Sequence, residues 1–125
     1  MVSFDKLILG DGPIYQQIVL YIKREISSGN IHSDDEMPSR RMLSALLGVN
    51  PNTIQKAYKI LEDEGIIESH SGAKSLVVLN ETKRKDIKKE LIETDAKNAV
   101  NVLKHMGISK KEAIDLLEKF WEEEI

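Results

Sequence analysis

Apolar side chains recur every three or four residues between residues 14 and 26, which is the spacing of one face of an α-helix. The residues on this face are Ile14, Ile18, Tyr21, Ile22 and Ile26. Asp11-Gly12-Pro13 is expected to open the helix, since proline fits the first turn, and Gly29 to close it as a C-cap. A shorter second helix is predicted behind Ser39, a candidate N-cap, with apolar positions at Met42, Leu43, Leu46 and Leu47.

A third helix is predicted to start sharply at Asn50, because Asn50 can act as its N-cap and Pro51 suits its first position. Its apolar stripe is Ile54, Ala57, Tyr58 and Leu61, and Gly65 ends it. The opposite face carries Asn52, Gln55, Lys56 and Lys59. Since a tight turn at Gly48-Val49 separates the second and third helices, the pattern predicts a helix-turn-helix.

Two β-leaning runs follow, at residues 66–70 and 75–79, on either side of the turn segment Ser71-Gly72-Ala73-Lys74. A helix-turn-helix that is followed by a hairpin is a winged helix. Residues 11–80 are therefore predicted to form one winged helix-turn-helix domain.

The remainder, residues 81–125, is predicted to form an antiparallel two-helix hairpin. Its first helix has a narrow apolar seam at Ile92, Ala96, Ala99, Leu103 and Met106 and ends at Gly107. Ser109 and Glu112 have the spacing of a capping box and start the second helix, whose apolar positions are Ala113, Ile114, Leu117, Phe120 and Trp121. The predicted fold class is mainly α with a small β-hairpin wing.

Composition limits the classes of function. With 125 residues, the chain can form one compact domain and a short extension. The absence of cysteine excludes disulfides and thiolate metal sites, and it suits a reducing cytoplasm. The N-terminus resembles neither a signal peptide nor a membrane span, so we expect a cytoplasmic protein without a membrane partner.

The net charge of −3 argues against a nucleic-acid partner, because Lys and Arg make the phosphate contacts. The positive charge is nevertheless local: residues 37–61 carry four basic residues and no acid. Asn and Gln match the edge of adenine and Arg that of guanine, so Asn52, Gln55 and Arg41 are candidates for base contacts. Thr53 and Lys59 are candidates for phosphate contacts.

These residues resemble the GntR family of regulators and, within it, the small YtrA-type members. The resemblance rests on residues 12–18, on Met37-Pro38-Ser39-Arg40-Arg41-Met42-Leu43 and on Val49-Asn50-Pro51-Asn52-Thr53-Ile54. It implies DNA contacts by Arg41, by Asn50, Asn52, Thr53 and Gln55 of the recognition helix, and by Gly72 at the wing tip. The full candidate set for DNA is Arg40, Arg41, Asn50, Asn52, Thr53, Gln55, Lys56, Lys59, Gly72 and Lys74.

The sequence departs from the family pattern in two places. Ser33-Asp34 stands where the family usually has Pro-Gly. The wing reads Ser71-Gly72-Ala73-Lys74-Ser75 instead of a Gly-x-Gly-Thr with basic neighbours, which weakens the expectation that it enters the minor groove.

A homodimer is the expected assembly, because a helical hairpin of about forty residues can hardly bury its seam alone. The residues assigned to this interface are Ile92, Ala96, Ala99, Leu103, Met106, Leu117, Phe120 and Trp121. The alternative is that the apolar residues pack on the winged domain. Dimerisation suits a palindromic operator with two half-sites. The resemblance further implies repression of a transporter operon.

No enzyme is expected. Asp34-Asp35-Glu36 is the best acidic cluster, but a solvated loop explains it better, and no phosphate loop or nucleophile elbow is present. His32, His70 and His105 are far apart, so no metal and no cofactor are predicted. A small-molecule effector of unknown identity stays open. The rival function is a winged helix that binds protein instead of DNA.

Overall fold

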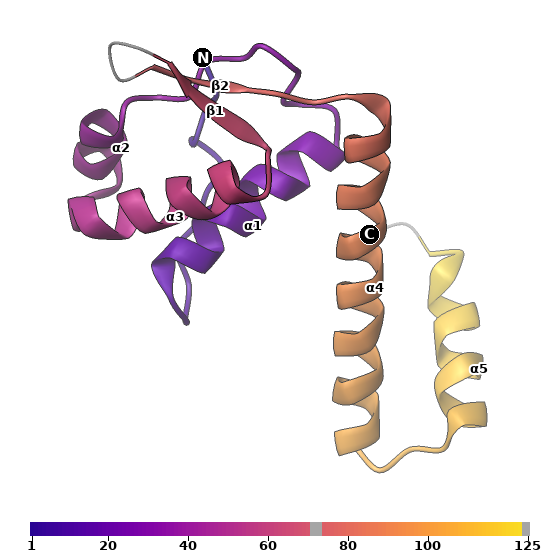
Figure 1. The fold of residues 1–125 in the computed structure, drawn as a ribbon. Coiled ribbons are helices and arrows are strands. Elements are labelled where there is room, and N and C mark those ends of the chain that lie inside the picture. The colour runs from indigo at the N-terminus through magenta and orange to yellow at the C-terminus, as the bar shows by residue number, and fades with distance from the viewer. Residues whose placement is uncertain (71–73, 124–125) are drawn as a thin grey trace. The chain divides into compact units, whose positions relative to one another are not determined.

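The computed structural model describes residues 1–70 and 74–123. Its contacts divide the chain into two compact units, Met1–Lys89 and Glu90–Ile125. The first unit holds three helices and a two-stranded antiparallel sheet, followed by the start of a long fourth helix (Figure 1). The predicted fold class, mainly helical with a small hairpin, is confirmed. The predicted domain bounds, 11–80 and 81–125, stay a prediction.

The first three helices begin close to the residues that the sequence predicts. α1 spans Ile14–Ser27, α2 spans Arg40–Leu47 and α3 spans Pro51–Asp63. Pro13 is the N-cap of α1 rather than a residue of its first turn. The Ser39 hydroxyl accepts a hydrogen bond from the Met42 amide at 3.0 Å, so Ser39 caps α2 as predicted.

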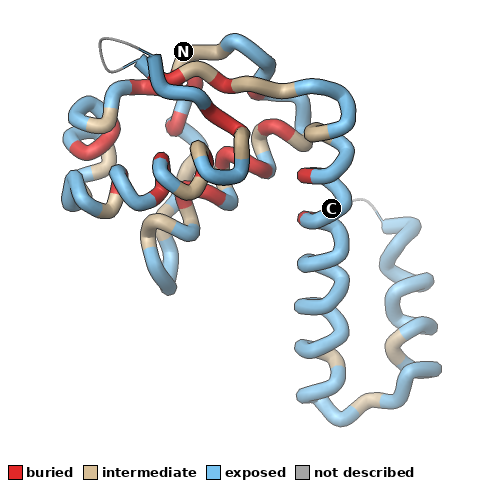
Figure 2. Tube along the Cα trace, viewed as in Figure 1, coloured by how far each residue is buried: buried red, intermediate tan, exposed pale blue. Residues whose placement is uncertain are grey.

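The core of the first unit lies between α1 and α3. Of the predicted stripes, Ile18, Ile22 and Ile26 of α1 and all four residues of α3 are buried, whereas Ile14 and Tyr21 are half-buried (Figure 2). α1 packs against α3. The predicted stripe of α2 is only partly right. Leu43 is fully buried, whereas the Met42 and Leu46 side chains are 48% and 61% exposed.

The wing is a hairpin of β1 (Ile67–His70) and β2 (Lys74–Val77). Ile67 pairs with Val77 and Ser69 with Ser75, so the register places Ile67 and Val77 in the core. The second strand thus starts one residue earlier and ends two residues earlier than predicted. Gly72, which the sequence places at the wing tip, lies outside the described residues.

Both ends of the first unit are tied to its core. Near the N-terminus, Val2 and Phe4 are buried, and the Phe4 ring stacks on Tyr21 at a centroid distance of 5.3 Å. At the other end, Arg84 donates to the Ile26 and Ile31 carbonyls at 2.9 and 3.0 Å. The first turns of α4 (Glu81–His105) therefore belong to the winged unit.

The second unit consists of the rest of α4 and of α5 (Lys110–Trp121). Ser109 accepts a hydrogen bond from the Glu112 amide at 3.1 Å, so the predicted cap of α5 is confirmed. α5 has no buried residue. The helices of this unit carry apolar positions, but few of these are buried. The core of the second unit is therefore smaller than that of the first. None of the helices in the described part of the chain is long and apolar enough to cross a membrane.

Candidate nucleic-acid interface

The turn between α2 and α3 fixes the start of α3. Gly48 adopts a φ of 66°, in the left-handed region, and the Ser44 hydroxyl donates to the Val49 carbonyl at 2.6 Å. The Asn50 side chain accepts from the Asn52 amide at 2.8 Å, and Pro51 occupies the first turn. The first turn of α3 is thus held by local contacts that the sequence predicts.

The outward face of α3 is polar, as expected. Asn52, Gln55, Lys56 and Lys59 are exposed, whereas Thr53 is half-buried. The side-chain oxygen of Asn50 is engaged as the helix cap, so this residue positions α3 even if its amide nitrogen also reaches DNA.

Tyr58 anchors the opposite face of α3. Its hydroxyl is fully buried and donates to the Pro38 carbonyl at 2.6 Å, which joins α3 to the segment before α2. Burial raises the pKa of Tyr58 well above its ordinary value, although the positive charge of Arg40 opposes this. Tyr58 therefore stays protonated and remains a hydrogen-bond donor.

The four cations of the acid-free stretch differ in their surroundings. Arg41 is exposed. Arg40, the preceding residue, is paired with Glu62 at 2.6 Å and lies over the Tyr58 ring, 4.9 Å from its centroid. Two adjacent arginines therefore have different surroundings, a difference that the local sequence did not predict.

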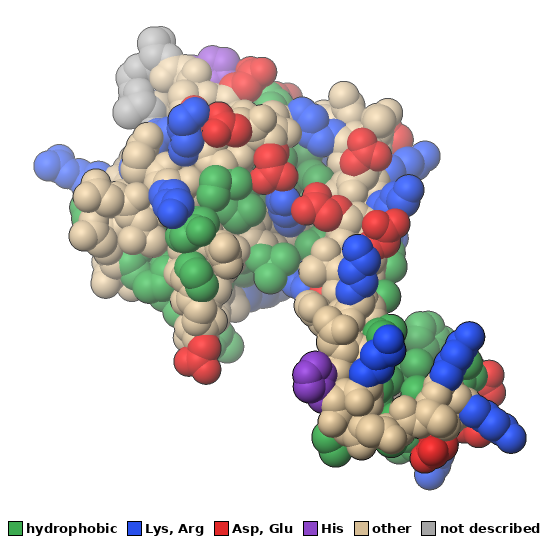
Figure 3. Space-filling view, turned by 60° about the horizontal axis from the view of Figure 1, so that its bottom comes forward, with side chains coloured by type: hydrophobic (Ala, Val, Ile, Leu, Met, Phe, Trp, Pro, Cys, Tyr) green, Lys and Arg blue, Asp and Glu red, His purple; other side chains and the backbone are tan. Residues whose placement is uncertain are grey.

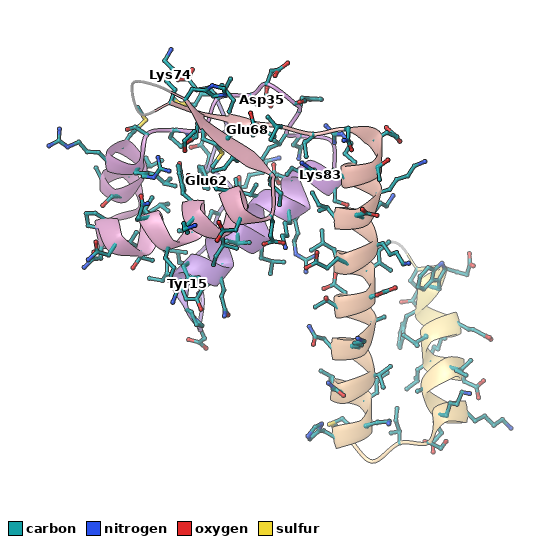
Figure 4. The ribbon with its side chains drawn as sticks, in the orientation of Figure 1. Tyr15, Asp35, Glu62, Glu68, Lys74 and Lys83 are labelled. Atoms are coloured by element: carbon teal, nitrogen blue, oxygen red, sulfur yellow. The ribbon has the colours of Figure 1, made fainter. Side chains whose placement is uncertain are left out.

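The two lysines of α3 also have intramolecular contacts. Lys59 pairs with Asp63 at 2.8 Å, and this hydrogen bond raises the pKa of Lys59. Lys56 lies over the ring of Tyr15, 4.0 Å from its centroid, and so connects α3 to the start of α1 (Figure 4). Because Lys56 and Lys59 are both exposed, each can exchange its contact for a phosphate.

Acids gather at the carboxyl end of α3, where the helix dipole disfavours them. Cations from other helices compensate: Arg40 of α2 pairs with Glu62, and Lys23 of α1 pairs with Glu64 at 2.8 Å. Lys83 of α4 donates to the Gly65 carbonyl (Figure 4). These contacts fix α3 from its far end. Sequence reasoning missed Glu62, Glu64 and Lys83, because only tertiary structure brings these partners together.

Charges of both signs are mixed on the surface in view in Figure 3, which agrees with the small net charge. On the wing, Lys74 is exposed at the start of β2. No group of three or more metal-binding side chains occurs among residues 1–70 and 74–123.

Comparison with known proteins places this interface in a family. Residues 14–77 match the family described as "Bacterial regulatory proteins, gntR family". The HTH-type transcriptional repressor YtrA of Bacillus subtilis (strain 168) is 47% identical over 60 residues, which are 48% of this chain and 46% of that protein. The chain thus aligns with less than half of the length of YtrA.

Solved structures extend the similarity beyond the winged domain. A GntR family transcriptional regulator from Listeria monocytogenes is 31% identical, with a TM-score of 0.76, over 90% of this chain and 98% of that one. The DNA-binding domain of AraR in complex with operator ORX1 is 30% identical, with a TM-score of 0.50, over 56% of this chain and 93% of that one.

The resemblance to GntR and YtrA-type regulators that the sequence indicates is confirmed by these matches. The relatives named are regulators, which confirms the expectation that the chain is not an enzyme. The chain therefore belongs to the GntR family of bacterial regulatory proteins and is a transcriptional regulator rather than an enzyme.

Proposed function

We propose that the chain is a homodimeric repressor that reads a palindromic operator with α3 and controls a transporter operon. The observation that carries the DNA contact is the outward face of α3, where Asn52, Gln55, Lys56 and Lys59 are exposed and no acid precedes Glu62. A capped helix with this face suits the major groove. The AraR domain, bound to its operator, has the same fold.

Within this proposal, the polar side chains of α3 divide into two roles. Asn52 and Gln55 pair with base edges, together with Arg41 from α2. Thr53, Lys56 and Lys59 hold phosphates, as does Lys74 on the wing. Lys59 must then leave Asp63, and this exchange makes its contribution smaller than that of a cation without a partner.

The homodimer rests on a separate observation, the exposure of the second unit. Trp121 is 80%, Met106 74% and Phe120 51% exposed, and no residue of α5 is buried (Figure 3). Large apolar side chains gathered in this way mark an interaction surface. We propose that a second copy covers them, with the eight interface residues that the sequence predicts; Leu103 is the half-buried member of that set.

The DNA contact is tested with duplexes that the protein itself selects from a random pool. In fluorescence anisotropy, the logarithm of the affinity should fall linearly with the logarithm of the salt concentration. Arg41→Ala and Gln55→Ala should each cost about 1 to 3 kcal/mol and relax the base preference. Lys111→Ala, an exposed change on α5, is the control and should leave both unchanged.

Undetectable or salt-insensitive binding would contradict the proposal and favour the alternative, a winged helix that binds protein. A regulator of this kind acts at the chromosome, so the expected cytoplasmic location belongs to the same proposal. A small-molecule effector at the dimer interface stays open.

A further inference from the structure

We infer that Arg40 is a positioning residue that fastens the wing to α3 rather than a contact to DNA. The inference rests on the proposed DNA-binding function. It removes Arg40 from the residues expected to contact DNA. The residues involved are Arg40 of α2, Glu62 of α3, Ser69 of β1 and Ser75 of β2, which together we call the Arg40 clamp.

The contacts of the clamp converge on one carboxylate oxygen. Nη2 of Arg40 donates to Oε1 of Glu62 at 2.6 Å and to Oγ of Ser69 at 3.3 Å. The Ser69 hydroxyl donates to the same Oε1 at 2.8 Å. Ser69 also meets the hydroxyl of Ser75, its cross-strand partner, at 3.3 Å. The Ser69 hydroxyl thus joins β1 to Glu62 of α3. Arg40 of α2 forms an ion pair with the same carboxylate oxygen.

The guanidinium of Arg40 is occupied and largely covered. Its side chain is 26% exposed and that of Glu62 is 30% exposed. The group lies over the Tyr58 ring, and its Nε atom is buried without a hydrogen-bond partner among the described residues. To reach a phosphate, Arg40 would have to give up Glu62 and leave that acid beside the DNA, which would repel it.

The clamp supplements the other contacts of the wing. A two-stranded hairpin is marginally stable by itself, because it gains few contacts for the chain that it orders. Ser75 is 2% exposed, and Ser69 is the side chain that meets its hydroxyl. Backbone hydrogen bonds already join β2 to residues 34–37. The clamp adds the side-chain contact between β1 and the carboxyl end of α3.

The location of Arg40 in the sequence agrees with this role. The resemblance to the family implies a DNA contact for Arg41 and implies none for Arg40. Arg41 is exposed and Arg40 is paired, so the two residues have separate tasks. The clamp is thus a feature of this chain's own residues.

The first test requires no DNA. Amide hydrogen exchange is measured on the full chain, on Arg40→Met, on Glu62→Met and on the double variant. Each single variant should speed exchange in β1 and β2 by roughly three- to tenfold, and the double variant should add little, because both changes break one network. Arg41→Met is the matched control, and exchange in its wing should keep the wild-type rates. Exchange in the core residues of α1 should keep the wild-type rates in every variant.

The second test measures binding to a duplex selected by the wild-type protein. Arg40→Met should weaken binding roughly three- to tenfold but keep the wild-type salt slope and base preference. Lys56→Met, which removes a proposed phosphate contact, should instead reduce the slope by about 0.9 per protomer. Arg40→Lys should keep part of the wild-type affinity, since its ammonium group can still donate to Glu62 and Ser69.

Two outcomes would overturn the inference. One is wild-type exchange in the wing of Arg40→Met or, if that variant does not fold, of Ser69→Ala. The other is a salt slope reduced as far as in Lys56→Met, together with tighter binding by Glu62→Met. If the wild-type protein selects no DNA, the proposed function fails, but the exchange measurements still decide on the clamp.

Discussion

Asp34 has a φ of 74°, in the left-handed region that L-residues avoid. It is the one non-glycine residue in this region among residues 1–70 and 74–123. Its amide donates to the Val77 carbonyl at 2.7 Å, so the loop before the wing holds this conformation. The family pattern usually has glycine at this position, and glycine adopts this φ without steric cost.

Asp34→Gly should therefore raise the free energy of unfolding by about 0.5 to 1 kcal/mol, because glycine adopts this φ without the steric cost. Denaturant unfolding measures the change. Asp35→Gly is the matched control and should lower stability, since the Asp35 carboxylate accepts from the His32 amide at 2.8 Å. Equal losses in both variants would show that Asp34 is not strained.

Arg40 and Arg41 show that the sequence predicts the local charge of a segment but not the partner of each charged side chain. The sequence places both in one acid-free stretch, and that count is correct for residues 37–61. Glu62 directly follows this stretch in the sequence. The fold places its Oε1 atom 2.6 Å from Nη2 of Arg40. Linear charge counting cannot predict this pairing, because the partners are 22 residues apart and only helix packing defines their distance.

At the scale of elements, helix starts were predictable and helix ends less so. Ser39, Asn50 and Ser109 cap their helices as predicted, since a cap is a contact over two or three residues. The carboxyl end of α3 depends on Lys23 and Lys83, which come from other helices. The burial of Val2 and Phe4 was likewise not predicted, because their periodicity is too short to define an element.

The end of α3 offers a test of this tertiary contribution. Gly65 has a φ of 73°, and a Cβ there would lie 3.2 Å from Nζ of Lys83, which donates to the Gly65 carbonyl. Gly29 has a φ of 81°, but no atom lies within 4 Å of its Cβ position. Gly65→Ala should therefore cost more than Gly29→Ala, by about 0.5 to 1 kcal/mol beyond the common backbone penalty.

Thermal or denaturant unfolding of both variants measures this difference. In a Lys83→Ala background the difference should shrink, since the crowded ammonium group is gone. Equal costs in the presence of Lys83 would show that the side chain moves aside freely and that α4 does not restrain the end of α3.

At the scale of the whole molecule, the two units differ in how their apolar residues are covered. In the first unit the stripes of α1 and α3 cover each other, whereas in the second unit Ile92, Val100, Leu117 and Trp121 remain exposed. The sequence predicts both helices of the second unit but cannot say what covers them. The proposed partner surface leaves no periodic signal in the sequence different from that of a core.

Leu117→Asn tests the proposed homodimer without removing Lys83 and Arg84, which a deletion of the tail from Glu81 would also lose. In a two-fold interface each change occurs twice, and burial of one leucine contributes at least about 1.5 kcal/mol. The Kd of the dimer should thus rise roughly a hundredfold, for a loss of about 3 kcal/mol. Sedimentation over a concentration series measures this constant, with Lys111→Asn as the matched control on the same helix.

DNA binding should follow the same order. A monomer engages one half-site, so Leu117→Asn should weaken binding to a two-half-site duplex far more than binding to a single half-site. Unfolding of the winged unit should be unchanged, because α5 contributes no buried residue. A Leu117→Asn protein that sediments as a wild-type dimer would place the interface elsewhere, and one with wild-type affinity for the paired half-sites would separate DNA binding from the tail.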